Sequence, residues 1–139
     1  MMGVGTVLLT NASGTIAQAA ARIIRSHFPS QDEVRLLGIQ FPGFSTARFS
    51  LDQVVDQPRG YSESSGIDEN WLEALCKSEG VSLIVPCTDY EPARMGDELR
   101  NRLPTVGAVR SDVAMIFYDK LATAEFFRSH NIPFATTYK

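Results

Sequence analysis

The amino-acid sequence predicts a three-layer α/β/α domain built on a central, mostly parallel sheet. Short apolar segments of strand length alternate along the chain with segments whose apolar residues recur at helical spacing. Such alternation is typical of parallel strands that are joined by right-handed helical crossovers. The length of 139 residues corresponds to one domain, and the hydrophobic fraction of 44% is ordinary for a globular protein.

The first strand, loop and helix form the clearest unit in the sequence. An apolar run at residues 7–9 is followed by a loop of small residues at 11–14 and then by a helical stripe. That stripe repeats at i, i+3, i+4, i+7 and i+8, and it consists of Ile16, Ala19, Ala20, Ile23 and Ile24. We therefore predict a buried strand that enters an amphipathic helix through a tight loop.

The loop before this helix is a candidate anion-binding site. The first turn of a helix leaves backbone N–H groups without an intrahelical acceptor, and the helix dipole favours a negative charge there. The sequence therefore predicts a loop that contacts an anionic cofactor through Asn11, Ala12, Ser13 and Gly14.

The next segments supply two more strands. Residues 34–39 are mostly apolar, as in parallel strands that are covered on both faces. Residues 53–56 are predicted to form a weaker edge strand, which Pro58 ends. A loop at 41–50 separates the two strands, and the polar stretch at 59–66 is expected to be a surface loop.

The second half of the chain continues the alternation. Asp68 can cap a helix that ends before Gly80, and residues 81–85 form a strand that Pro86 ends. Pro92 can open a helix that reaches about residue 102. A short strand at 104–108 and two helices, at 111–117 and 120–130, follow. The inward face of the helix after Asp68 is expected to consist of Trp71, Leu72, Leu75 and Cys76.

Charge and composition exclude several classes of function. The net charge of −3 gives no electrostatic basis for binding nucleic acid or an anionic membrane. No apolar run approaches the ~18 residues of a membrane span, and the N-terminus lacks the basic region of a signal peptide.

The two cysteines, Cys76 and Cys87, do not have the spacing of a zinc site. We expect a cytoplasmic protein with free thiols and no metal ligands.

Charged residues after the strand at 81–85 form a second candidate site, because ligands of parallel sheets bind beyond the carboxyl ends of the strands. Asp89 and Glu91 follow that strand, and Arg94 comes about one helical turn later. Two carboxylates there could hold a metal or a cationic group of a substrate. Alternatively, they cap the next helix.

Lys120 is the third candidate. At the first position of a helix, its cation lies at the positive end of the dipole, which costs about 0.3–1 kcal/mol at an exposed site. A bound phosphate would reverse the sign of this interaction. Alternatively, the preceding Asp119 or solvent neutralises the charge.

The first loop also permits a dinucleotide-binding interpretation. Thr10 and Gly14 fit the loop of short-chain dehydrogenases, although Asn11 and Ala17 replace two of its glycines. No acidic residue follows the second strand to bind a ribose, and a Tyr-x-x-x-Lys pair for hydride transfer is absent from the sequence. Arg48, with Ser45 and Thr46, could take a 2′-phosphate. An NAD(P)-binding module and a non-catalytic interaction domain therefore remain alternatives.

Four features in a fixed order resemble a known family. They are the small-residue loop at 11–14, the sequence Val-Pro-Cys-Thr-Asp-Tyr-Glu at 85–91, Asp119-Lys120, and Ile-Pro-Phe-Ala-Thr at 132–136. Together they resemble the N-terminal, pre-ATP-grasp domain of ATP-grasp enzymes similar to the carbamoyl-phosphate synthase large subunit. The resemblance implies a Rossmann-like domain at residues 1–117 and the start of an ATP-grasp domain at residues 118–139.

The resemblance also implies a function. ATP-grasp ligases activate a carboxylate with ATP and join it to an amine or ammonia, so the chain would be the substrate-side domain of such an enzyme. Lys120 would contact an ATP phosphate, together with the loop at 11–14. Asp89, Glu91 and Arg94 would face a small-molecule carboxylate or amine.

The remaining parts of the family's ATP and Mg²⁺ site would follow residue 139. We therefore expect that this chain alone binds no cofactor tightly and is inactive, and that it works with an ATP-grasp domain in cis or in trans. Four aromatic residues near the C-terminus should be partly exposed, or should pair two chains into a homodimer; they are Phe126, Phe127, Phe134 and Tyr138.

Overall fold

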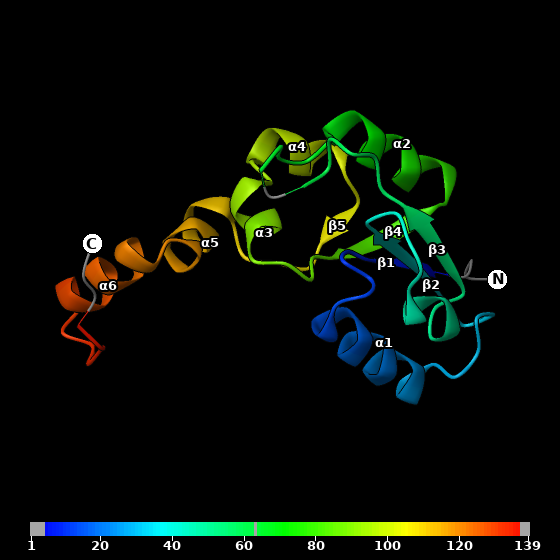
Figure 1. Cartoon of the computed structure of the whole chain (residues 1–139), viewed down its shortest axis with the longest axis horizontal. Helices are drawn as coiled ribbons and strands as arrows, with labels where there is room; N and C mark the ends of the chain where they lie inside the picture. Colours follow the sequence, from blue (N-terminus) through cyan, green and yellow to red (C-terminus); the bar gives the residue numbers. More distant parts are fainter. Residues whose placement is uncertain (1–4, 63, 137–139) are drawn as a thin grey trace.

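A five-stranded, all-parallel sheet forms the centre of the computed structural model, which describes residues 5–62 and 64–136 (Figure 1). Its strand order is β3-β2-β1-β4-β5. The strands are β1 (Gly5–Leu9), β2 (Val34–Gln40), β3 (Gln53–Asp56), β4 (Val81–Val85) and β5 (Thr105–Val106). The predicted parallel sheet is therefore confirmed, including the edge position of β3.

Helices cover both faces of the sheet. The described helices are α1 (Thr15–His27), the short 3₁₀ helix η1 (Thr46–Phe49), α2 (Glu69–Ser78), α3 (Tyr90–Arg94), α4 (Asp97–Arg102), α5 (Ser111–Tyr118) and α6 (Lys120–Ser129), of which the last two do not cover the sheet. Figure 1 places α1 on one side of the sheet and α2 with α4 on the other. The predicted three-layer α/β/α architecture is thus confirmed.

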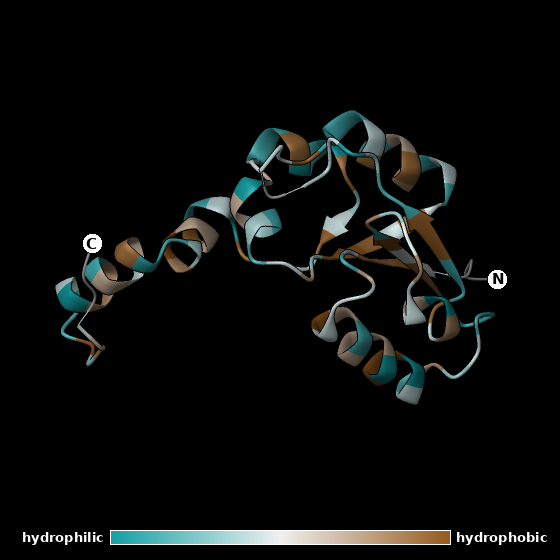
Figure 2. Ribbon diagram, in the orientation of Figure 1, coloured by the Kyte–Doolittle hydropathy of each residue, from teal (hydrophilic) through white to brown (hydrophobic). Residues whose placement is uncertain are grey.

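The side chains of the strands form two cores, one on each face of the sheet, and much of the sheet has the colour of hydrophobic residues in Figure 2. On β1, Leu8 packs toward α2 and α4, whereas Val7 and Leu9 pack toward α1. Gly38 of β2 allows a close approach on the α1 side, because a Cβ atom there would lie 2.7 Å from Cβ of Ala12 and would also meet Leu51. The loop after β1 therefore packs directly on the neighbouring strand.

The buried face of α1 does not coincide with the apolar stripe that the sequence predicts for this helix. Ala17 and Ala21 are buried against the sheet, but Ile16 and Ile23 are 60% and 63% exposed. Ala20 and Ile24 are only partly buried. The helix is rotated so that small side chains contact the sheet, and the two isoleucines lie on its outer surface.

The helix predicted to run to about residue 102 is instead two helices, α3 and α4. The chain turns at Met95, which is fully buried in the core, and Gly96 is the N-cap of α4. Arg100 stabilises this turn, since its guanidinium donates to the carbonyls of Met95 (2.7 Å) and Val109 (2.7 Å). Burial of Met95 and the glycine cap explain why the helix does not continue.

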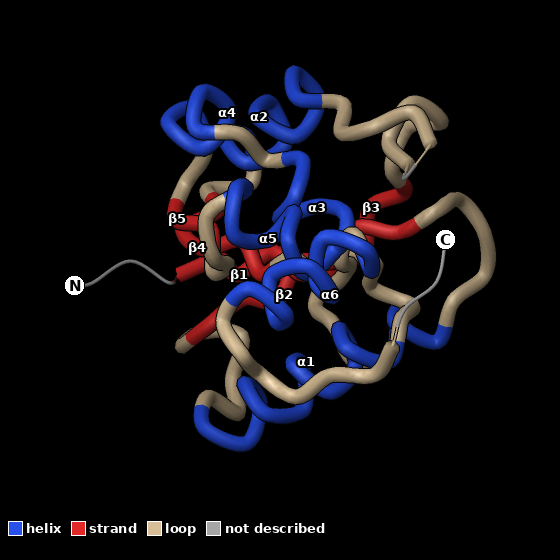
Figure 3. The backbone as a smooth tube through the Cα atoms, turned by 90° about the vertical axis from the view of Figure 1, so that its left-hand side faces the viewer, coloured by secondary structure: helices blue, strands red, loops and turns tan. Residues whose placement is uncertain are grey.

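The last two helices project from the body of the domain (Figures 1 and 3). The ring of Phe117 on α5 contacts Phe126 and Phe127 of α6 edge-on, with centroids 6.2 and 6.4 Å apart. Phe134 packs on Phe127 and is half exposed, as expected, whereas Tyr138 lies outside the described residues. Pairing of two chains through this segment, and a domain boundary after residue 117, stay predictions.

Candidate functional site

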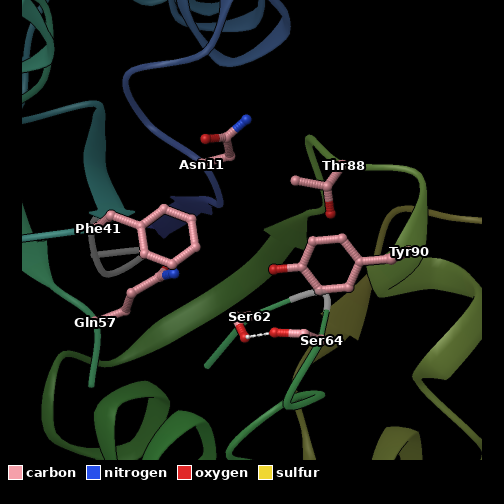
Figure 4. A pocket seen from close by; sticks show the side chains of 7 residues that line it. All are labelled: Asn11, Phe41, Gln57, Ser62, Ser64, Thr88 and Tyr90. Atoms are coloured by element: carbon pink, nitrogen blue, oxygen red, sulfur yellow. Dashed lines mark hydrogen bonds between the residues drawn. The ribbon is translucent and has the colours of Figure 1, made fainter. Parts of the chain in front are cut away.

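A cavity of about 430 Å³ lies at the carboxyl ends of the central strands. Loops that follow β1, β2, β3 and β4 contribute its walls, as expected for a ligand site of a parallel sheet. The described lining consists of Asn11, Phe41, Gln57, Ser62, Ser64, Thr88 and Tyr90 (Figure 4). We call this space the strand-end cavity.

A buried carboxyl group lies beneath this cavity. Glu91 is only 1% exposed, and its side chain accepts hydrogen bonds from three hydroxyl groups. Tyr61 donates to Oε1 at 2.6 Å, Thr88 donates to Oε2 at 2.7 Å, and Thr10 also donates to Oε2. Burial raises the pKa of Glu91, although the three hydroxyl groups partly offset this effect.

Thr10 connects this carboxyl group to a second strand end. Its hydroxyl oxygen donates to Glu91 and accepts a 2.7 Å hydrogen bond from the backbone N–H of Cys87. Asn11 follows Thr10 directly, and Thr88 follows Cys87, so two cavity walls are held by the same group. The described contacts give Glu91 no cationic partner. The three hydroxyl groups instead supply the hydrogen bonds that a buried carboxyl group needs.

The loop between β3 and α2 forms the third wall. Gln57 donates its side-chain amide to the carbonyl of Tyr61 at 2.8 Å. Beyond Tyr61, the backbone groups of Ser62 and Gly66 exchange hydrogen bonds of 2.9 and 2.7 Å, and Gly66 has a φ of +91° that favours glycine. The tyrosine ring also contacts Trp71 edge-on. The described part of the polar stretch at 59–66 is therefore a folded turn that places Tyr61 in the core.

Two aromatic rings face the cavity from opposite sides. In Figure 4, Phe41 projects from the end of β2 and Tyr90 from the start of α3. Phe41 is 54% exposed, whereas Tyr90 is largely buried. The cavity thus has aromatic sides, with hydroxyl and amide groups between them.

A second, shallower cavity of about 330 Å³ lies on the other side of Thr88. Residues after β4 and residues of α5 line it together with Ile16 of α1. They include Cys87, Asp89, Pro92, Ala114, Phe117 and Tyr118.

The predicted anion-binding loop is only partly available to a ligand. Asn11 lines the strand-end cavity, with a φ of +45°, and Ser13 is exposed. The N–H of Ala12 is bonded to the carbonyl of Ile39 (2.8 Å), and that of Gly14 to the carbonyl of Asn11 (2.7 Å). Because these two donors are occupied within the protein, an anion cannot use them in this conformation.

The three charged residues predicted to face a substrate are not brought together. Asp89 borders the second cavity, and its side chain makes no capping bond to α3. Glu91 is buried beneath the strand-end cavity, whereas Arg94 is exposed at the end of α3 and lines neither cavity.

Lys120 is exposed at the first position of α6 and also lines neither of these cavities. Asp119 caps this helix, since its carboxylate accepts from the N–H groups of Leu121 (2.8 Å) and Ala122 (3.3 Å). The partial positive charge at the start of α6 is therefore already neutralised in part by the carboxylate of Asp119.

A metal site is not formed by the described residues. Within residues 5–62 and 64–136, no group of three His, Cys, Asp or Glu side chains could hold a metal ion. In the same part of the chain, no helix has both the length and the apolar character needed to cross a membrane.

Sequence reasoning missed the residues that fix the cavity. Tyr61 lies in a stretch that resembles an ordinary polar loop, and Thr10 and Thr88 lie in the motifs quoted above but had no predicted role in a cavity. One signal was present: a tyrosine among serines and glycines is unusual for a solvent-exposed loop, because its ring favours burial.

No protein-family model and no curated protein matches the sequence, but solved structures of carboxylases and of a glycinamide transformylase have a similar fold. The biotin carboxylase domain of Hydrogenobacter thermophilus 2-oxoglutarate carboxylase has a TM-score of 0.66 and 15% identity over 96% of this chain and 29% of that one. Glycinamide-RNase-transformylase T from Mycobacterium tuberculosis has a TM-score of 0.67 and 13% identity over 94% of this chain and 34% of that one.

A biotin carboxylase subunit of pyruvate carboxylase is also similar, with a TM-score of 0.64 and 15% identity over 94% of this chain and 28% of that one. The chain therefore spans about a third or less of the length of these proteins. It has the Rossmann-like fold of a pre-ATP-grasp domain. At these identities the likeness concerns the fold alone.

Proposed function

We propose that this chain is the substrate-side domain of an ATP-dependent ligase of the ATP-grasp type, similar to carbamoyl-phosphate synthase. Such an enzyme would join a carboxylate to an amine or to ammonia. The observation that carries the proposal is the strand-end cavity, which lies where parallel sheets bind ligands and which several loops build together. We propose that the small-molecule substrate binds there.

The size and lining of the cavity suit such a substrate. A volume of about 430 Å³ falls in the range of small-molecule sites. Asn11 and Thr88 offer an amide and a hydroxyl group that can orient a carboxylate or an amine (Figure 4). Because Glu91 is buried below them, we assign it the role of positioning Thr88 rather than contacting the substrate.

The described residues do not form an ATP and Mg²⁺ site by themselves. No cluster among them could hold a metal ion, and two N–H groups of the loop at 11–14 are occupied within the protein. The proposal therefore assigns most of the nucleotide site to an ATP-grasp domain in cis or in trans. Lys120, exposed at the start of α6, would add one cation toward a phosphate group. Bound ATP would supply the phosphoryl group that activates the carboxylate.

The proposal is tested by reconstituting the chain with an ATP-grasp segment encoded after it or beside it. We expect Mg²⁺-dependent release of ADP that requires a carboxylate and an amine or ammonia. Thr88→Val should reduce this activity, because it removes a hydroxyl group from the cavity wall. Arg22→Lys is the control, since Arg22 lies exposed on α1 and does not line the strand-end cavity.

Two results would count against the proposal. The first is Mg²⁺-dependent ATP hydrolysis by the chain alone that Lys120→Ala abolishes, because the site would then be complete without a second domain. The second is tight binding of NADPH with no binding of ATP by the reconstituted protein, which would favour the dinucleotide-binding alternative.

A further inference from the structure

We infer that the strand-end cavity takes a flat aromatic or heteroaromatic ring, which lies between the side chains of Phe41 and Tyr90. The substrate class would then be a ring-bearing carboxylate or amine. The reaction of such a molecule rests on the ligase function proposed above, but its binding does not.

The arrangement of the two rings is the main observation. Phe41 and Tyr90 come from different elements and lie on opposite sides of the cavity (Figure 4). Phe41 is 54% exposed although it directly follows the buried residue Gln40 of β2. A ring inserted between them would cover the apolar surface of Phe41 and meet the hydroxyl-bearing edge of Tyr90, whose oxygen points toward Phe41 in Figure 4.

Polar groups lie along the edges of the same space. Asn11 and Thr88 lie on one side of the two rings, and Ser62 and Ser64 lie on the other (Figure 4). The Thr88 hydroxyl donates its proton to Glu91, so its oxygen is left to accept a hydrogen bond from a ligand. These edges suit a planar molecule with N–H, O–H or carbonyl groups at its rim.

Hydrogen bonds to Glu91 hold the walls at Thr88 and beside Ser62 in place before any ligand binds. The buried carboxyl group of Glu91 is bonded to Thr88 and to Tyr61, the neighbour of Ser62. A preorganised site loses less conformational freedom on binding than a flexible one. Aromatic rings also make favourable edge or offset contacts with the rings of Phe41 and Tyr90, which saturated rings of the same carbon count do not make.

The inference is tested with matched pairs of small probes. Benzoate and benzylamine are compared with cyclohexanecarboxylate and cyclohexylmethylamine, which have the same charges but puckered rings. Binding is followed by amide chemical shifts of the intact chain, without ATP. We expect at least one aromatic probe to bind about three- to tenfold more tightly than its saturated counterpart, in the millimolar range. The shifts should centre on the residues that line the strand-end cavity.

Variants of one aromatic wall provide the controls. Phe41→Leu keeps an apolar side chain but removes the ring, so it should abolish the preference for the flat probe. Phe41→Tyr should retain it. Phe49→Leu is the matched control, because Phe49 is also exposed but does not line the cavity.

Several outcomes would overturn the inference. They are equal binding of the flat and puckered probes, a preference that survives Phe41→Leu, and the absence of any shift at the cavity. A reconstituted ligase that uses only aliphatic substrates would also overturn it while leaving the proposed function intact. Conversely, binding of the ring by the chain, together with no ligase activity of the reconstituted protein, would support the inference and remove the proposed reaction.

Discussion

The hydroxyl group of Tyr61 donates a 2.6 Å hydrogen bond to the carboxyl group of Glu91, and both side chains are almost fully buried. Tyr61 lies in the loop before α2, whereas Glu91 lies within α3. This bond, with those from Thr10 and Thr88, joins the loops that surround the strand-end cavity. It is therefore the contact on which the shape of the cavity most depends.

Loss of this bond should destabilise the protein. Tyr61→Phe keeps the buried ring but removes one donor to a buried carboxyl group, so we expect a loss of about 1–3 kcal/mol in the free energy of unfolding. Urea titration measures the change. In a double-mutant cycle with Glu91→Gln, the two effects should be clearly non-additive, because the residues are in direct contact. Additive effects would contradict the contact.

Stability should also depend on pH through Glu91. Burial raises the pKa of this carboxyl group above its ordinary value of 4.5, so the folded protein keeps the proton to higher pH than the unfolded chain. The protonated side chain of Glu91 therefore contributes to the free energy of unfolding. This contribution is fully present below about pH 4.5 and is lost as the pH rises through the raised pKa of Glu91.

Glu91→Gln cannot ionise, so it serves as the reference for this effect. The free energy of unfolding of the natural protein should fall relative to that of the variant as the pH is raised from about 4.5 toward neutrality. Denaturant titrations of both proteins at a series of pH values measure this difference. A difference that stays constant with pH would show that Glu91 does not titrate in this way.

Both cysteine thiols should react slowly in the folded protein. Cys76 and Cys87 are buried, and burial raises the pKa of each thiol to about 11. Because the thiolate is the reactive form, neither should be modified readily near neutral pH. Titration with a chromogenic disulfide reagent should find little reaction before unfolding and two thiols after it. Rapid modification of Cys87 alone would indicate that the second cavity opens in solution.

Substitution of Gly38 should be costly. A Cβ atom at this position would lie 2.7 Å from Cβ of Ala12 and would also meet Leu51. We expect Gly38→Ala to lower the free energy of unfolding by about 1–3 kcal/mol through overpacking. Gly5→Ala is the matched control on the neighbouring strand, since its nearest contact would be Ser82 at 3.4 Å. Equal stability of both variants would contradict this packing.

Periodicity alone was sufficient to predict the layers and the parallel sheet. The strands at β1, β2 and β4 are apolar runs of the right length, and turn or capping residues such as Asp68 and Pro86 mark the element ends. These are local signals, which a sequence carries directly. The rotation of α1 was not predictable in the same way, because alanine and isoleucine are both apolar and both fit the predicted buried stripe. Only the distance between the helix and the sheet decides that the smaller alanine side chains face the sheet.

The site was harder to predict than the fold for a physical reason. Asn11 and the residues after β4 could be proposed from the sequence because they follow strands, whose carboxyl ends are known places for ligands. Tyr61 was missed because its role depends on Glu91, a partner thirty positions away whose proximity only the folded chain creates. Charge in the sequence also did not predict burial, since Glu91 is buried and Lys120 is exposed.

The construction of the cavity from four separate loops has a practical consequence. Unfolding any one strand end would dismantle it, so a molecule that occupies it binds only the native state. At a concentration of about one hundred times its dissociation constant, such a molecule would add about 2.7 kcal/mol to the stability of the whole domain. Melting curves recorded across a compound library would therefore detect the natural ligand without any knowledge of the reaction.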